Sequence, residues 1–100
     1  MIQANDIVGR KNQIKDYLIA GNMERAIPKL IDWTRDIAPD TEEEDLAITI
    51  SFKFNNNKKS FNNDEITDEQ KNISNTKLVR QILQLMREVT TNLSDYERAA

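Results

Sequence analysis

The sequence contains neither cysteine nor histidine among its 100 residues. The lack of cysteine excludes disulfide bonds, zinc-thiolate sites and a thiol nucleophile, and it fits a protein of the reducing cytoplasm. The lack of histidine removes the commonest general base and the commonest metal ligand, and with them a Ser-His triad. We therefore expect no enzymatic activity, no cofactor and no bound metal.

Glycine and proline are also scarce, with two of each, so few residues are suited to β-turns. No run of about 18 apolar residues occurs, and residues 1–15 lack the apolar segment of a signal peptide. The net charge is −3, with acidic residues concentrated between 36 and 45, which disfavours electrostatic binding to nucleic acid. Neither a nucleic-acid nor a membrane partner is therefore expected. These features predict a soluble, cytoplasmic, all-α protein.

Two helices are expected in the first third of the chain. The first is predicted over 6–20, with an irregular start because Gly9 costs about 1 kcal/mol in a helix interior, and Gly21 follows where a left-handed residue ends many helices. The second is predicted over about 23–37, with a kink or a late start near residue 27 because Pro28 lacks an N–H group. Their apolar faces consist of Ile7, Ile14, Tyr17 and Leu18, and of Met23, Ala26, Ile27, Leu30, Ile31, Thr34 and Ile37, with Trp33 near the edge.

The next segment is ambiguous, because residues 46–54 alternate between apolar and polar side chains as a half-buried strand would. The preceding residues favour a helix, since Thr41 and Glu44 have the spacing of a capping box. Acidic residues follow this cap and lysines lie toward the other end, as the helix dipole favours. We therefore predict a helix over about 42–62, with an apolar arc of Leu46, Ala47, Ile50, Phe54 and Phe61.

A fourth helix is predicted to begin after Thr67, which forms a second capping-box pattern with Gln70. Its apolar face is strongest late, at Leu78, Val79, Ile82, Leu85, Met86, Val89 and Leu93. Because the connections are short, we expect two helical hairpins that form a compact antiparallel four-helix bundle. Residues 1–93 would form this single domain, and 94–100 would be a frayed tail or the start of a linker.

The polar and aromatic clusters offer few candidate sites. The acidic run at 42–45 could in principle hold a hard cation, but adjacent helical residues do not share a face, and a dipole-complementing helix start explains it better. Lysines 53, 58 and 59 could touch phosphate, although a solvated helix end is the simpler explanation. The aromatic side chains could stack on bases, but core packing is a far commoner use.

Two apolar residues of the third helix, Ile48 and Phe52, point away from its predicted core arc. One interpretation is that neighbouring helices bury them from a second side. The other is that they form the apolar centre of an interaction surface, with Lys53, Lys58 and Lys59 at its rim. These lysines would then face an acidic patch on a second copy that includes Glu42, Glu43 and Asp45, which suits head-to-tail assembly.

Parts of the sequence resemble the effector-associated domains, specifically the eleventh subfamily. The resemblance rests on Ile50–Asn55, on Phe61, on Ile66–Asn72 and on the leucine-rich segment Leu78–Met86, preceded by the hairpin segment Leu18–Ala26. It spans about residues 14–89. This sequence departs from the family pattern in having Lys53 and Phe54 for arginine and tyrosine, Asp64 where glycine is usual, and Pro28 inside the second helix.

The resemblance implies a small α-helical adaptor of bacterial conflict systems, without catalytic activity of its own. Such domains are thought to associate homotypically, so a homo-oligomer is expected, and to bring an effector such as a peptidase or TIR-type enzyme to a STAND-type NTPase sensor. With Met1 at one end, the chain is compatible with the N-terminal module of a longer protein. An alternative is a free-standing acidic regulator, an inhibitor or antitoxin, that binds one heterologous protein. A nucleic-acid-binding bundle is a weaker third reading.

Overall fold

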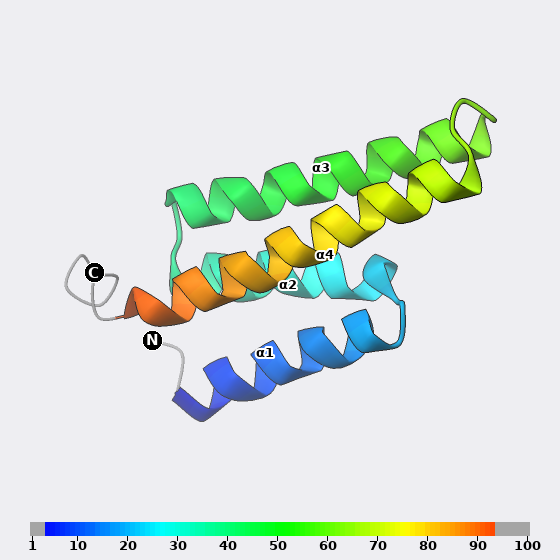
Figure 1. The fold of residues 1–100 in the computed structure, drawn as a ribbon. Helices are drawn as coiled ribbons and strands as arrows, with labels where there is room; N and C mark the ends of the chain where they lie inside the picture. Colours follow the sequence, from blue (N-terminus) through cyan, green and yellow to red (C-terminus); the bar gives the residue numbers. More distant parts are fainter. Residues whose placement is uncertain (1–3, 94–100) are drawn as a thin grey trace.

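The computed structural model describes residues 4–93, with side chains from Asp6 onward, and these residues form four α-helices (Figure 1). The helices are α1 (Ala4–Ile19), α2 (Met23–Ile37), α3 (Glu42–Asn62) and α4 (Asp68–Thr91). Consecutive helices run in opposite directions, and the part of the chain described here contains no strand. The predicted all-α bundle of two helical hairpins is therefore confirmed, and residues 46–54 are helical. The expected tail at 94–100 lies outside the described residues.

The first hairpin turns at Gly21, which has a φ of 73°. The N–H groups of Asn22 and Gly21 donate to the carbonyls of Tyr17 and Leu18 at 2.8 and 3.0 Å, which is the Schellman arrangement for ending a helix. The Asn22 side chain then accepts from the backbone N–H of Arg25 and caps α2. Because of this cap, α2 begins at Met23 and not near residue 27, as the proline had suggested; Pro28 lies on the exposed side.

The expected irregular start of α1 is also absent, since this helix is continuous through Gly9. Glycine weakens a helix only modestly, and Ile7, just before it, is buried in the core. Packing of this first turn against α2 therefore outweighs the local preference of the glycine.

Helix α2 is the central element, because it packs against each of the other three helices, whereas α1 and α4 make little direct contact. Trp33, expected near the edge of its apolar face, is completely buried, and its indole N–H donates to the carbonyl of Ile7 at 3.0 Å. Trp33 is covered, although it lies at the edge of the apolar face of α2, because α1 packs against that side of α2. The buried core consists of Ile7, Ile14, Met23, Ala26, Ile27, Leu30, Trp33, Ile37, Ala38, Ala47, Ile50, Leu78, Ile82, Leu85, Met86 and Val89.

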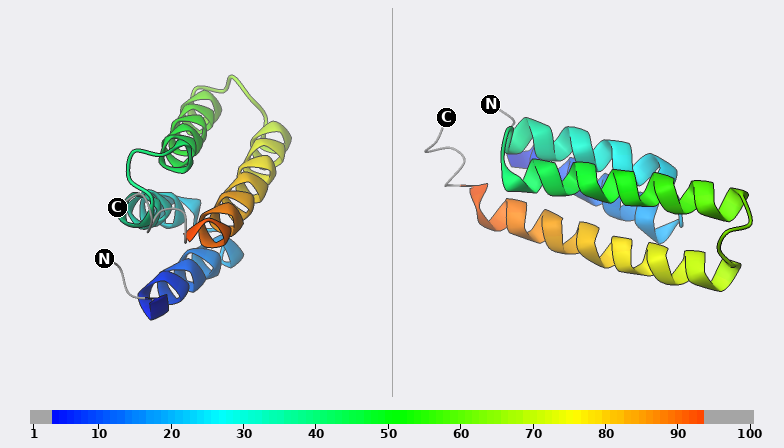
Figure 2. Two further views of the ribbon diagram at one scale, coloured as in Figure 1. Left: turned by 90° about the vertical axis from the view of Figure 1, so that its left-hand side faces the viewer. Right: turned by 90° about the horizontal axis from the view of Figure 1, so that it is seen from above.

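The second hairpin is longer than the first and extends past it, which gives the molecule principal extents of 47, 24 and 16 Å (Figures 1 and 2). In the projecting part, α3 packs mainly against α4, with Lys58 also reaching Glu24 of α2, and no residue between Ser51 and Lys77 is fully buried. Phe54 and Phe61, predicted in the core arc, are consequently only partly buried. Leu46 was also expected there but is exposed, because it lies at the edge of the side that α2 and α4 cover.

The turn of the second hairpin has the same architecture as the first, with Asp64 in the place of glycine. Asp64 has a φ of 58°, and the N–H groups of Glu65 and Asp64 donate to the carbonyls of Ser60 and Phe61. Aspartate tolerates this left-handed conformation better than most residues. Thr67 and Gln70 then form the complete predicted capping box, with hydrogen bonds of 2.9 and 3.2 Å. Within residues 4–93, no helix is long and apolar enough to cross a bilayer.

Candidate association surface

The side of α3 that faces away from the bundle carries two large exposed apolar side chains, Ile48 and Phe52. Their exposed fractions are 44% and 69%, whereas Ile50, between them in sequence, is completely buried. The two positions are one turn apart and lie within about 40° around the helix axis. Asp45 precedes them and Lys59 follows them on the same side. We call Asp45, Ile48, Phe52 and Lys59 the α3 outer face, and the structure leaves it uncovered by other described residues.

The three lysines predicted at the rim lie on different sides of α3. Lys59 belongs to the α3 outer face, and Lys53 is exposed on an adjoining side. Lys58 points toward α2, where its ammonium lies 2.7 Å from the Glu24 carboxylate. This hydrogen bond and the lysine charge lower the pKa of Glu24. Lys58 is therefore already paired within the chain.

The predicted acidic residues lie in the first turn of α3. Glu42 and Asp45 are exposed, and Glu43 is half-buried. In this turn they interact favourably with the positive end of the helix dipole. Glu42 and Asp45 are three residues apart, so they share a side and extend the α3 outer face toward its acidic end.

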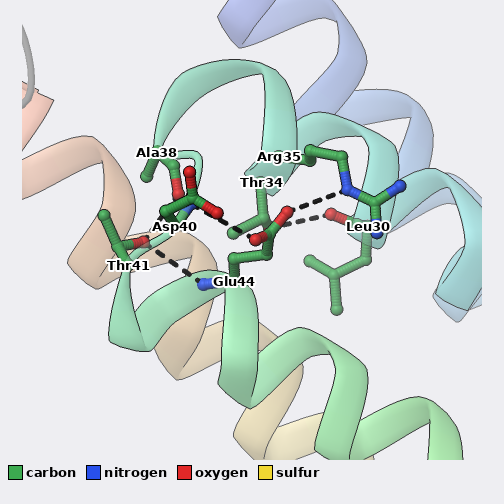
Figure 3. Close-up of polar contacts among 7 residues, drawn as sticks. All are labelled: Leu30, Thr34, Arg35, Ala38, Asp40, Thr41 and Glu44. Atoms are coloured by element: carbon green, nitrogen blue, oxygen red, sulfur yellow. Dashed lines mark hydrogen bonds and ion pairs between the residues drawn. The ribbon is translucent and has the colours of Figure 1, made fainter. Parts of the chain in front are cut away.

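Glu44 fixes the direction in which α3 leaves the α2–α3 junction, and Figure 3 shows its contacts. Its side chain accepts from Arg35 Nε at 2.8 Å and from the backbone N–H of Asp40 at 3.2 Å. Thr41 accepts from the Glu44 N–H at 3.3 Å and donates to the carbonyl of Ala38 at 2.6 Å. The predicted capping box is thus only half formed, because the Glu44 carboxylate turns to Arg35 and Asp40 instead of the Thr41 amide.

These contacts lower the pKa of the Glu44 carboxyl below its ordinary value of 4.5. The hydrogen bond from Arg35 is the main cause of this lower pKa. Burial of the residue, which is 8% exposed, acts in the opposite direction and raises the pKa. The hydrogen bond from the Asp40 N–H and the positive charge of Arg35 lower the pKa further. Because the folded state holds this pKa below the unfolded value, the ionised carboxylate stabilises the fold above about pH 4.5, and the contribution is lost as pH falls through the folded pKa.

Glu44→Gln should therefore flatten the pH dependence of stability on the acid side. We expect the urea midpoint of the wild-type chain to fall more steeply than that of the variant between pH 5 and 3, because only the wild type must protonate this carboxylate. Glu42→Gln, in the same helical turn but exposed, serves as the matched control. Parallel curves for the wild type and Glu44→Gln would show that the Arg35–Glu44 contact does not stabilise the fold.

The structure exposes further apolar side chains that the sequence analysis did not single out. They are Val8 and Ile19 on α1, and Ile73 and Leu83 on α4. The 3- and 4-residue spacing of Val8, Lys11, Lys15 and Ile19 along one side of α1 was the available signal. Leu83 carried no such signal, because it lies inside a leucine-rich segment whose other members are core residues.

The described residues hold little catalytic chemistry. Residues 4–93 contain no group of three or more acidic side chains placed to share a metal ion. A shallow hollow between the first hairpin turn and α4 has a mixed lining that includes Leu18, Glu24, Lys71, Asn75 and Val79. Asn75 Oδ1 is a buried side-chain oxygen without a hydrogen-bond partner among the described residues.

The fold and its exposed faces define a small all-α bundle with apolar and charged side chains available for contact. The family model for effector-associated domain 11 matches residues 9–90. The chain therefore belongs to the effector-associated domain 11 family, as the resemblance at residues 14–89 had indicated. No curated protein matches the chain. No solved structure matches it either.

Proposed function

We propose that this domain is a non-catalytic association module that binds another copy of itself through the α3 outer face. In a bacterial defence system it would act in the cytoplasm and couple an effector, such as a peptidase or TIR-type enzyme, to a STAND-type NTPase sensor. Membership of the effector-associated domain 11 family supports an association role in general. The exposure of Ile48 and Phe52 is the observation that supports a contact through α3.

The physical argument for this surface is the free energy gained when a partner removes the apolar side chains of Ile48 and Phe52 from water. Full burial of an exposed isoleucine or phenylalanine side chain contributes roughly 1.5 to 3 kcal/mol, and these two side chains remain exposed together on one side of α3. The charged residues Asp45 and Lys59 at either end would orient a partner along the helix. An apolar centre with a charged rim is the usual composition of a protein interface.

Phe52→Lys tests the proposal. Because Phe52 lies outside the core, the variant should remain folded and change the free energy of unfolding by about 0.5 kcal/mol or less. Its self-association should weaken by about tenfold or more, since a charge would replace a buried ring at the contact. Sedimentation velocity over a range of concentrations measures the association, and circular dichroism measures the folding.

Ile73→Lys is the matched control, because it places the same charge at another exposed apolar position, on α4. It should associate as the wild type does. If Phe52→Lys melts normally and still assembles with wild-type affinity, Phe52 is not part of the interface. A wild-type chain that stays monomeric at all concentrations would contradict the proposal and would favour the alternative, a regulator that binds one heterologous partner.

A further inference from the structure

A second surface of mixed apolar and charged character lies on α1 and α4. Val8, Lys11 and Lys15 follow one another at steps of three and four along α1, so they share one side of that helix. Leu83 and Arg87 are four residues apart and share one side of α4. We call these five residues the α1–α4 basic face. Val8 is 55% and Leu83 36% exposed, and Lys15 and Arg87 are exposed as well.

The two helices contribute to a single surface, because Leu18 of α1 and Val79 of α4 line the same hollow. Lys15 lies about one turn before Leu18, and Leu83 lies about one turn after Val79. The pKa of the Lys11 ammonium lies below its ordinary value, first because the residue is partly buried and then because of the charges of Lys15 and Arg87. Helices α1 and α4 run in opposite directions (Figure 1). Lys15 comes one turn after Lys11 on α1, and Leu83 comes one turn before Arg87 on α4, so Lys15 and Leu83 are displaced in the same direction along the bundle.

The positive charges of this face are not neutralised within the described part of the chain. The salt bridges among residues 4–93 use the cations Arg10, Arg35 and Lys58. The cations of the α1–α4 basic face form none of these pairs, although the whole chain has a net charge of −3. A partner that combines carboxylates with apolar side chains would both offset these charges and cover Val8 and Leu83.

The first half of α3 has this composition. Glu42 and Asp45 supply carboxylates, and Ile48 and Phe52 supply exposed apolar side chains on an adjoining part of the same helix side. We infer that the α1–α4 basic face of one copy receives this acidic and apolar half of α3 from a second copy. The inference rests on the proposed function, since it names the surface that the α3 outer face contacts.

The geometry of the bundle leaves both surfaces available in one chain. They consist of different residues on different helices, and α1 and α3 lie at opposite corners when the bundle is viewed along its length (left view of Figure 2). Contact between two unlike surfaces is heterologous, so each added copy leaves one surface of each kind free at the ends. The assembly would therefore grow head to tail. The α1–α4 basic face takes the role that the sequence analysis had given to Lys53, Lys58 and Lys59.

Charge reversal on each surface tests this assignment in the full chain. One variant carries Lys15→Glu and Arg87→Glu, a second carries Glu42→Lys and Asp45→Lys, and a third carries all four changes. A control with Lys29→Glu and Lys77→Glu alters the net charge by the same amount as the first variant, at exposed positions outside both surfaces. Circular dichroism verifies folding, and sedimentation velocity measures assembly.

We expect the first and second variants each to self-associate about tenfold or more weakly than the wild type, because two attractions become repulsions. An equimolar mixture of the two should regain assembly, because one contact joins the two native surfaces and the alternate contact joins the two reversed surfaces, whose charges are also opposite. The chain with all four changes should regain assembly, because both signs are exchanged. The control should assemble as the wild type does.

Three results would overturn the assignment. The first variant could assemble like the wild type, the four-change chain could fail to regain assembly, or the control could weaken it equally. If any of these occurs while Phe52→Lys still weakens assembly, the proposed function stands and only the receiving surface is wrong. A wild-type chain that never associates would instead contradict the proposed function itself.

Discussion

Trp33→Ala is expected to lower the free energy of unfolding by about 3 to 5 kcal/mol. The indole is the largest completely buried side chain, it lies on the central helix α2, and its N–H donates to the carbonyl of Ile7 on α1. The substitution would remove this cross-helix hydrogen bond and leave a cavity where α1 packs on α2. Since small domains have total stabilities of roughly 5 to 15 kcal/mol, a large part of the fold's stability would be lost.

Trp33→Phe separates the two contributions of the indole. Phenylalanine keeps most of the apolar volume but cannot donate to the Ile7 carbonyl, so we expect a much smaller loss, on the order of 1 to 2 kcal/mol. Urea denaturation followed by circular dichroism measures both variants. A Trp33→Ala chain within 1 kcal/mol of the wild type would contradict the central position of this side chain in the core.

Ile50→Ala should cost about 2 to 5 kcal/mol, because Ile50 is completely buried between α3 and its neighbours. Ile48 offers a matched comparison, since it is the same residue type on the same helix, two positions away, and is 44% exposed. Ile48→Ala should change the free energy of unfolding by only about 0.5 kcal/mol. The same denaturation experiment measures both.

The difference between these two variants depends on the rotation of α3 about its axis. If Ile48→Ala were as destabilising as Ile50→Ala, α3 would bury both of its sides, and Ile48 would belong to the core. The sequence analysis left that interpretation open, and it would also remove the physical basis for an association surface on α3.

Much of the fold follows from local signals in the sequence. The 42–62 helix was expected from the Thr41 cap and the dipole-favoured charges, despite the strand-like alternation of residues 46–54, and α3 has the same bounds. Gly21 and the Thr67–Gln70 capping box also have their predicted roles. These signals involve residues that are close together in the sequence, so they can be recognised without knowledge of the tertiary structure.

The exceptions arise where contacts between distant residues decide the outcome. Trp33 is buried because α1 covers a side of α2 that the apolar spacing alone would leave at the edge. Phe54 is only partly buried because the second hairpin extends past the first. Glu44 bonds to Arg35, nine residues away, and so leaves the capping box at Thr41 incomplete. The α1–α4 basic face combines residues of α1 and α4 that are 68 to 79 positions apart in the sequence.

The departure from the family pattern at Asp64 has a structural explanation. The left-handed conformation at this position is the one that glycine adopts without steric cost, and Asp64 adopts it with a φ of 58°. The backbone hydrogen bonds from Asp64 and Glu65 therefore form this turn without a glycine.

The proposal that this domain associates with itself is tested most directly by the mass of the wild-type chain in solution. Sedimentation equilibrium over a wide concentration range, at near-physiological salt, gives the weight-average mass. Self-association predicts a mass that rises steadily with concentration above the monomer value of 11.6 kDa. A mass that stays at the monomer value at every concentration would contradict the proposed function.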